Sequence, residues 1–229
     1  MRKCIFLLSI FLFFLAADSF SKASDIGVPL GKSPLYDQLQ LKSGDLLKEM
    51  VVLPEYKFDQ VEASKIVKRL DLLPRAILSK ANQQHIKIIL FDGSLTDIES
   101  ASHLKGKVPR GYPETVLWDD LPGVGGSQHV LVKIGCSEKG SGHGSVNLEY
   151  HELAHSLQRF VYNGERAEVQ ITRSWEKEAA SLFPGKDYFM HYKEEFFAES
   201  FAYFFYSAQT RAELKKSAPV MYEYLSGLS

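Results

Sequence analysis

Several kinds of residue and segment are scarce in this sequence, and each shortage excludes a class of protein. The 229 residues contain only 2 cysteines, Cys4 and Cys136, too few for a disulfide-stabilised scaffold. The formal net charge is −1, and short basic clusters such as Lys215-Lys216 are typical of a solvated helix face, so we expect no nucleic-acid partner. The sequence has no internal repeat and no low-complexity segment, which excludes solenoids, fibres and disordered chains.

The one long hydrophobic run lies at the start of the sequence. A positively charged beginning is followed by an almost entirely apolar stretch over residues 4–17 and then by small residues. This order is typical of a secretory signal peptide, and the run is short for a membrane span. We expect cleavage of residues 1–23 before Ser24, with Ala17-Asp18-Ser19 as a competing site and an uncleaved membrane anchor as the alternative. The product would be extracellular, without stable membrane association and with Cys136 as its lone cysteine.

The hydrophobic pattern of residues 24–229 predicts a single α+β domain. Strands are expected at 85–91 and 129–136, the second with Val130, Val132, Ile134 and Cys136 on one face and Leu131 and Lys133 on the other. Helices are expected at 35–50, 59–81 with a kink at Pro74, 99–105, 146–162, 165–182, 193–207 and 209–227, and a long irregular loop at 106–126. Strands early and helices late indicate a small sheet packed against a helical half.

The strongest chemical pattern is the H-E-x-x-H motif from His151 to His155 in the predicted helix 146–162. Positions i and i+4 lie on one helix face, so the two imidazoles can bind one Zn²⁺. Glu152 projects beside them and can hold a metal-bound water. The alternative is a pair of helix histidines that bind no metal.

A catalytic zinc needs a third protein ligand and one open coordination position. In the extended motif H-E-x-x-H-x-x-G-x-x-H the third histidine would fall near Val161, and none follows His155 until His191, so that version is excluded. The third ligand must then be a carboxylate from a later helix.

Three glutamates are candidates for that ligand. Glu194, Glu195 and Glu199 lie in a stretch crowded with phenylalanines, where a carboxylate is costly unless it is paired or binds metal. Glu195 and Glu199 share a helix face, and Glu199 would orient a ligand histidine through its free ring nitrogen. The alternative for each glutamate is an exposed helix charge.

Several long motifs of the chain resemble a known family. The segments HELAH and EEFFAESFAYFF resemble the peptidase domain of anthrax lethal factor. The stretch from about Leu104 to Leu225 more closely resembles the secreted Pro-Pro endopeptidases of Gram-positive bacteria, and weaker similarity extends back to about residue 40. The motifs that carry it are LKGKVPRGY, WDDLPGVGGS, GSGHGSVNLEYHELAH, EEFFAESFAYFF and LKKSAPVMYEYL.

The resemblance implies a zincin fold, with a small twisted sheet over the active-site helix and a mostly helical C-terminal half. It implies one Zn²⁺ per chain, held by His151, His155 and Glu195, with Glu152 as the general base. It also implies an electrophilic tyrosine seven residues before the glutamate ligand, here Tyr188, whose phenol can donate to a developing oxyanion. Spacing alone would not separate it from nearby tyrosines.

The resemblance also implies a substrate, because these relatives cut between two prolines in extended linkers of bacterial surface proteins. Trp118 corresponds to their substrate tryptophan, and its flat apolar indole suits a proline ring. Gly125, Gly126 and Ser127 lie in a loop that corresponds to a flexible segment of these relatives, which closes over the bound substrate. The family's best-known member pairs the glutamate at the Glu194 position with a lysine two residues before the tryptophan. Val116 stands there in this sequence, so Glu194 is without that lysine partner and the resemblance leaves the subsite preference open.

These observations predict a secreted, monomeric zinc metalloendopeptidase that cleaves Pro-Pro bonds in proline-rich extended segments of extracellular or cell-surface proteins. The substrate is expected along the edge of the strand 129–136. Three alternatives stay open: a peptidase of this fold with another bond preference, as in the toxin relative; a non-catalytic surface-binding module; and a structural zinc site with His143 as fourth ligand.

Overall fold

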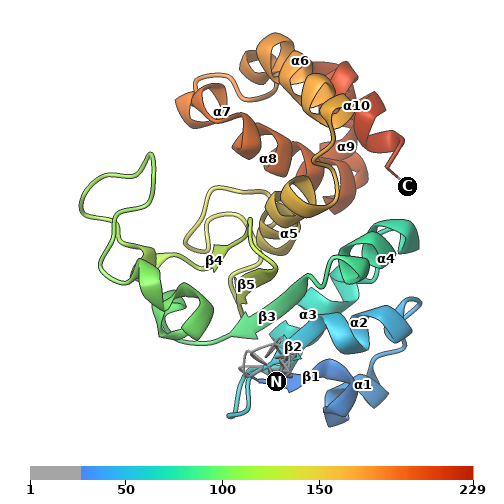
Figure 1. The fold of residues 1–229 in the computed structure, drawn as a ribbon, viewed down its shortest axis with the longest axis vertical. Helices are drawn as coiled ribbons and strands as arrows, with labels where there is room; N and C mark the ends of the chain where they lie inside the picture. The colour runs from blue at the N-terminus through green and yellow to red at the C-terminus, as the bar shows by residue number, and fades with distance from the viewer. Residues whose placement is uncertain (1–26, 229) are drawn as a thin grey trace, which may run out of the picture.

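Figure 1 shows the fold of this computed structural model, which describes residues 27–228. Strands lie in the first part of the chain and helices dominate the second, as the sequence pattern predicts. The predicted leader, residues 1–23, lies outside the described residues. None of the helices in the described part is both long and apolar enough to span a lipid bilayer.

The first part of the chain builds a mixed sheet with helices beside it. Its elements are β1 (Val28–Pro29), η1 (Leu30–Lys32), α1 (Pro34–Gln38), α2 (Gly44–Met50), β2 (Val51–Leu53), α3 (Gln60–Leu70), α4 (Arg75–Gln83), β3 (Lys87–Phe91), η2 (Leu95–Asp97), η3 (Glu99–Leu104), η4 (Trp118–Asp120), β4 (Gly123–Val124) and β5 (His129–Lys133). The strand order is β1-β2-β3-β5-β4. The three central strands are parallel, and the outer two, β1 and β4, are antiparallel to their neighbours.

The second part of the chain is helical. Its elements are α5 (Leu148–Phe160), α6 (Glu165–Leu182), α7 (Asp187–His191), α8 (Lys193–Tyr206), α9 (Ala208–Ser217) and α10 (Pro219–Ser226). In Figure 1 these helices lie on one side of the sheet, with α5 between the sheet and α8.

The central strand β5 separates two apolar cores. Val130, Val132 and Ile134 belong to the large core shared with the helices, as predicted for one face. Leu131 belongs to a smaller core on the opposite face of the sheet. Alternate side chains of a strand point to opposite faces, so β5 is buried on both sides. Its inner face packs directly on α5.

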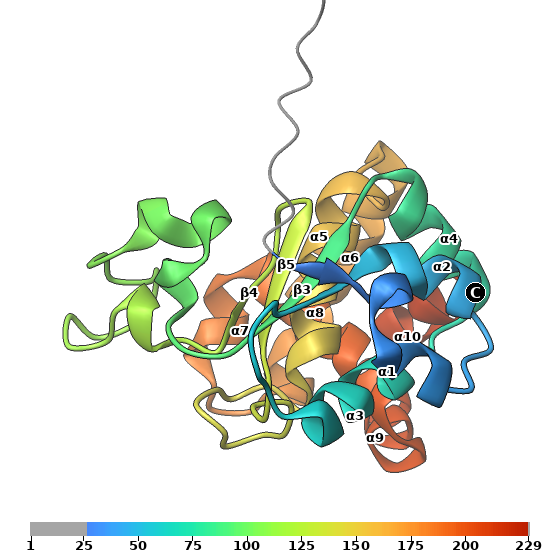
Figure 2. The same cartoon turned by 90° about the horizontal axis from the view of Figure 1, so that it is seen from below.

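The smaller core is covered by the segment from η2 to η4. Leu95, Ile98 and Ala101 are buried there, and the half-buried Trp118 packs against them. The segment projects on the side of the molecule away from the C-terminus (Figure 2). The expected irregular loop 106–126 is therefore mostly irregular, but it also contains η4 and the short edge strand β4.

Helix α5 is fixed at its start and on its far face. The Asn147 side chain accepts a hydrogen bond from the Tyr150 backbone N–H at 3.0 Å, which caps the helix N-terminus. Glu149 is fully buried and pairs with Arg69 of α3 at 2.5 Å. A buried carboxylate needs such a partner, so this ion pair holds the rotation of α5 about its axis.

Two helices predicted as continuous are each divided at a proline. The pattern 59–81 becomes α3 and α4, because Pro74 precedes α4 and begins a new helix instead of kinking one. The pattern 209–227 becomes α9 and α10, with Pro219 in the first turn of α10. Proline has no backbone N–H and a fixed φ, which suits a helix start and not a helix interior.

The predicted helix 35–50 is also wrong as a continuous element. Asp71 accepts hydrogen bonds from the backbone N–H groups of Lys42 and Ser43 at 2.8 and 2.7 Å, which fixes a turn between α1 and α2. The predicted short helix at 99–105 is the 3-10 helix η3. The sequence pattern did not predict α7, β1, β2 or β4, which are too short for periodicity to detect.

Glu178 of α6 is a buried carboxylate that holds α10 in place. Its two oxygens accept the backbone N–H groups of Val220 and Met221 at 2.7 and 3.0 Å. We expect Glu178→Gln to lower the free energy of unfolding by about 2 kcal/mol, because an amide offers one acceptor where the carboxylate offers two. Urea denaturation would measure this. Glu176→Gln, an exposed change on the same helix, is the control; equal effects of both changes would contradict the assigned role.

Candidate active site

The two histidines of the H-E-x-x-H motif lie one turn apart on α5 and face the same space. Their ring centroids are 4.9 Å apart, and the Nε2 atoms of His151 and His155 are separated by 3.2 Å. The i, i+4 spacing on a helix produces this convergence.

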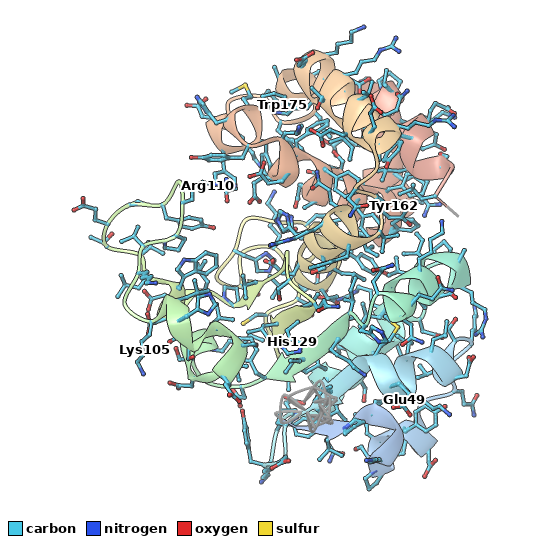
Figure 3. All side chains as sticks on the ribbon, viewed as in Figure 1. Glu49, Lys105, Arg110, His129, Tyr162 and Trp175 are labelled. Carbon is cyan, nitrogen blue, oxygen red and sulfur yellow. The ribbon has the colours of Figure 1, made fainter. Side chains whose placement is uncertain are left out.

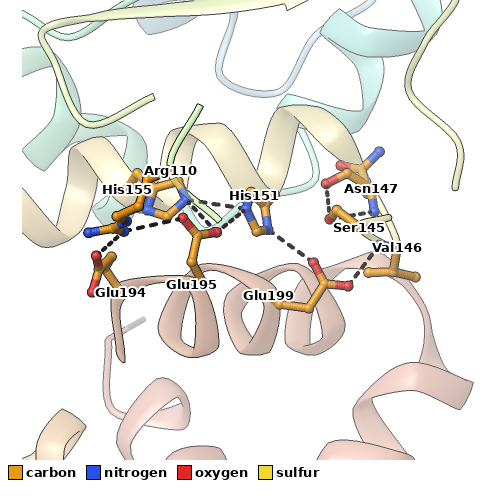
Figure 4. Close-up of polar contacts among 9 residues, drawn as sticks. All are labelled: Arg110, Ser145, Val146, Asn147, His151, His155, Glu194, Glu195 and Glu199. Carbon is orange, nitrogen blue, oxygen red and sulfur yellow. Dashed lines mark hydrogen bonds and ion pairs between the residues drawn. The ribbon is translucent and has the colours of Figure 1, made fainter. Parts of the chain in front are cut away.

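Glu195, in the first turn of α8, completes the cluster. Its Oε2 lies 3.2 Å from His151 Nε2 and 3.4 Å from His155 Nε2 (Figure 4). One ligand atom from each of the three residues lies within 4.8 Å of the others. The packing of α8 against α5 brings together groups that are far apart in the sequence.

Glu199 lies one turn after Glu195 and touches the back of the cluster. Its Oε2 is 3.0 Å from His151 Nδ1, and its Oε1 accepts the Val146 backbone N–H at 2.8 Å. Its side chain is only 2% exposed. This contact orients the His151 ring and leaves Nε2 directed at the other two donors.

The charges in this cluster are mutually dependent. Burial pulls the pKa of His151 down, but hydrogen bonds to Glu195 and Glu199 outweigh burial and raise it well above its usual value. Burial would raise the pKa of Glu195, yet the two histidines lower it. Such a cluster is stable only with positive charge among its donors, supplied by protons or by a metal ion. Two imidazole nitrogens and one carboxylate oxygen, with His151 oriented from behind, are a donor set that fits a divalent metal of the zinc type.

Glu152 lies beside the cluster at the cleft, beneath the edge strand. Burial raises the pKa of its carboxyl, while the two histidines and the Gly125 backbone N–H oppose the rise. A Cβ atom at Gly125 would lie 2.0 Å from the Glu152 carbonyl oxygen, so only glycine allows this approach. The edge of the sheet therefore rests directly on the helix turn that carries Glu152.

The segment after β4 is fastened to α5 by three hydrogen bonds. The Gly126 N–H donates to Ser156 Oγ at 3.1 Å, Ser156 Oγ donates to the Ser127 carbonyl at 2.7 Å, and Arg159 donates to the Gly126 carbonyl at 2.8 Å. Gly125 and Gly126 line the cleft, whereas the Ser127 hydroxyl is outside the lining and donates to the His129 carbonyl. Of the three predicted loop residues, two reach the site.

The cluster opens into a cleft of about 920 Å³ between the sheet and the helical half. Trp118, Tyr188 and Glu194 all line it, as does Tyr112. Burial, the nearby charge of Glu195 and a hydrogen bond to it all raise the pKa of Tyr188. Its phenol is therefore protonated at neutral pH and can donate a hydrogen bond into the cleft.

Glu194 lacks the lysine partner expected from the family but has another cation. The guanidinium of Arg110 is hydrogen-bonded to Glu194 Oε1, and Val116 takes no part. Arg110 is also 4.0 Å from Glu195 Oε1. The sequence alone does not single out Arg110, because no spacing rule links it to Glu194, 84 residues later.

His143 lines the cleft but does not belong to the cluster of His151, His155 and Glu195. Its Nε2 lies 2.8 Å from the Cys136 carbonyl oxygen, and Cys136 is a half-buried free thiol. Within residues 27–228, the one group able to hold a metal consists of His151, His155 and Glu195. A four-ligand structural site with His143 therefore has no support in the geometry.

Three comparisons relate the chain to known proteins. The family model described as anthrax toxin lethal factor, N- and C-terminal domain, matches residues 38–228. The Pro-Pro endopeptidase of Paenibacillus alvei is 39% identical over 201 residues, which are 87% of this chain and 90% of that protein. The Pro-Pro endopeptidase of Clostridioides difficile strain 630 is 41% identical over 186 residues, 81% of this chain and 84% of that protein.

A solved structure also matches. The structure of the Pro-Pro endopeptidase from Paenibacillus alvei superposes with a TM-score of 0.75 at 39% sequence identity, covering 80% of this chain and all 100% of that one. This match confirms the predicted α+β, zincin-like fold.

Gly125 provides a test of the contact between the edge strand and α5. We expect Gly125→Ala to lower the free energy of unfolding by about 2 kcal/mol, because the added methyl overlaps the Glu152 carbonyl. Differential scanning calorimetry should show a melting temperature lower by roughly 4–8 °C. Gly144→Ala, where a Cβ meets nothing within 4 Å and which lies outside the helices, is the control. A melting temperature unchanged in both variants would mean that the two elements do not touch in solution.

Proposed function

This chain belongs to the Pro-Pro endopeptidase family, and we propose that it is a secreted, zinc-dependent metalloendopeptidase that hydrolyses bonds between two prolines. The observation that carries the proposal is the cluster of His151, His155 and Glu195 beside Glu152 in one cleft. The substrates would be proline-rich extended segments of extracellular or cell-surface proteins. The signal-peptide pattern of residues 1–23 supports secretion, and we propose that the secreted protein is a monomer.

The three donors would hold one Zn²⁺, which supplies Lewis acidity and lowers the pKa of a bound water. Glu199 prepares the site by fixing the orientation of the His151 ring. Because Glu199 is itself held by the Val146 N–H, the orientation depends on the start of α5 as well as on α8.

Glu152 is placed to move the proton. Its carboxylate takes a proton from the attacking water and then donates it to the proline nitrogen as the peptide bond breaks. An X-Pro bond has no N–H before cleavage, so the leaving nitrogen must gain this proton to depart as an amine. Burial raises the pKa of Glu152, which makes its carboxylate a stronger base towards the attacking water in the first half of the reaction.

Tyr188 would stabilise the negative charge that develops on the scissile carbonyl oxygen. Its phenol is protonated and lies near Glu195, on the side of the cluster contributed by the helical half. The single O–H of Tyr188, which is hydrogen-bonded to Glu195 in the free site, would turn to the substrate oxygen as that oxygen becomes charged, so this hydrogen bond would lower the barrier more than it tightens binding.

The walls of the cleft suit a proline-rich peptide. Trp118 is held half-buried by the smaller core and offers a fixed apolar face. A Pro-Pro segment is stiff and extended, so it loses little chain entropy on binding. The expected position of the substrate along the strand 129–136 is wrong in one respect, because β4 pairs with that strand on the cleft side. The free edge available to a peptide is therefore that of β4, residues Gly123–Val124.

Cleavage of a quenched peptide library X-X-Pro-Pro-X-X by purified 24–229 protein tests the proposed function. We expect cleavage between the prolines, abolished by a zinc chelator and restored by added Zn²⁺, and absent in Glu152→Ala. Mass spectrometry of the products identifies the bond. Cleavage of other peptides while Pro-Pro peptides stay intact would retain the peptidase and reject the bond preference. Metal binding without any cleavage would instead favour a binding module.

Tyr188→Phe tests the phenol separately from the metal cluster. We expect kcat to fall about 100-fold with KM nearly unchanged, because one oxyanion donor is removed and the ring remains. Steady-state kinetics and the zinc content of the variant would be measured together. Tyr192→Phe is the comparison; a larger loss in that variant would reassign the donor role to Tyr192.

A further inference from the structure

The loop between η3 and η4 crosses from the sheet half to the helical half at residues 110–112. Figure 3 places Arg110 at the tip of this loop, facing the region of α7 and α8. Three consecutive residues of the tip contact the same small area, which contains Tyr188, Tyr192 and Glu194.

Arg110 makes the charged part of this contact. It is hydrogen-bonded to Glu194 and lies 4.0 Å from Glu195 (Figure 4). Its guanidinium carbon is 4.1 Å from the centroid of the Tyr192 ring. The Arg110 side chain is 56% exposed, so the pair contributes little to folding. Its effect is expected in the cleft, where it sets the local charge.

The neighbouring residues of the tip fit closely around the proposed catalytic tyrosine. Gly111 has φ +79°, and a Cβ there would lie 2.8 Å from the Tyr188 ring, so a side chain is excluded. Tyr112 meets Tyr188 edge to face, with ring centroids 6.2 Å apart. The tip is thus shaped to this surface, which places the Arg110 guanidinium next to Glu194.

Few charged groups line the cleft. Among the carboxylates that line it in residues 27–228, Glu194 is the one that accepts a hydrogen bond from a cation of the loop tip, residues 110–112. Glu195 faces the two histidines, and Glu168 pairs with Lys193. The cleft lining within the described residues contains two arginines and no lysine, and Arg159 is engaged with the Gly126 carbonyl. Arg110 is therefore the cation that decides whether Glu194 presents a bare negative charge to a bound peptide.

We propose that Arg110 is a specificity-determining residue, which masks Glu194 and so lets the cleft accept peptides without a basic side chain near the scissile bond. The inference rests on the proposed peptidase function. Removal of the guanidinium leaves an unpaired carboxylate at the cleft wall, which attracts a lysine and repels a glutamate in the substrate. The converse change, removal of the carboxylate, leaves Arg110 unpaired and reverses the sign of the preference.

The test uses Pro-Pro peptides that carry lysine or glutamate at each position flanking the two prolines, and measures kcat/KM for each. In Arg110→Ala the lysine-to-glutamate ratio should rise about 10-fold at one position, with KM carrying most of the change. In Glu194→Gln the ratio at that position should fall instead. Arg75→Ala, which breaks a similarly exposed pair with Asp45 on the surface, is the matched control and should leave the ratio unchanged.

Opposite changes of the ratio in the two variants distinguish a charge role from a purely structural one. If the loop only held the two halves together, each variant would lose activity equally for the lysine and the glutamate peptides. The double variant Arg110→Glu/Glu194→Arg should return the ratio towards that of the wild type. Should Arg110→Ala fail to fold, Arg110→Gln replaces it: the lysine-to-glutamate ratio should rise in Arg110→Gln and fall in Glu194→Gln. Cleavage by the wild type with ratios unchanged in every variant would overturn the inference, whereas no Pro-Pro cleavage by the wild type would overturn the proposed function itself.

Discussion

The packing of α8 against α5 is the contact on which the rest of the site depends. It buries phenylalanines of α8 in the large core and sets Glu195 and Glu199 against the two histidines of the motif. Apolar burial supplies the free energy that holds charged groups together in a place where none would be stable alone. The geometry of the cluster is therefore a consequence of core packing, reached through side chains that take no part in the chemistry.

The sheet acts on the same helix from the opposite side. The strand β5 sits between two apolar cores, and β4, paired to it, passes so close to α5 that glycine is required at Gly125. The edge of the sheet thus forms one wall of the cleft and supplies a backbone N–H to Glu152. A peptide bound along this edge, as we propose, would lie next to the Glu152 carboxylate and to the histidine cluster at the same time.

The loop that carries Arg110 connects the sheet half of the molecule with the helical half. It begins and ends in the small core on the outer face of the sheet, yet its tip contacts the helical half. This bridge places the Arg110 guanidinium beside Glu194 and supplies no donor to the cluster of His151, His155 and Glu195. If Arg110 acts as we propose, substrate preference could change in this loop while the residues of α5 and α8 stay the same.

The sequence by itself determined the elements whose patterns are long and local. Periodicity located α5, α6, α8, β3 and β5, and the motif spacing put His151 and His155 on one helix face. Family likeness, and not spacing, selected Glu195 among three glutamates. Only the tertiary structure decided the partner of Glu194, the closeness of β4 to α5, and the breaks at Pro74 and Pro219. Those features depend on contacts between distant segments, and hydrophobic periodicity records which face of an element is buried but not what it is buried against.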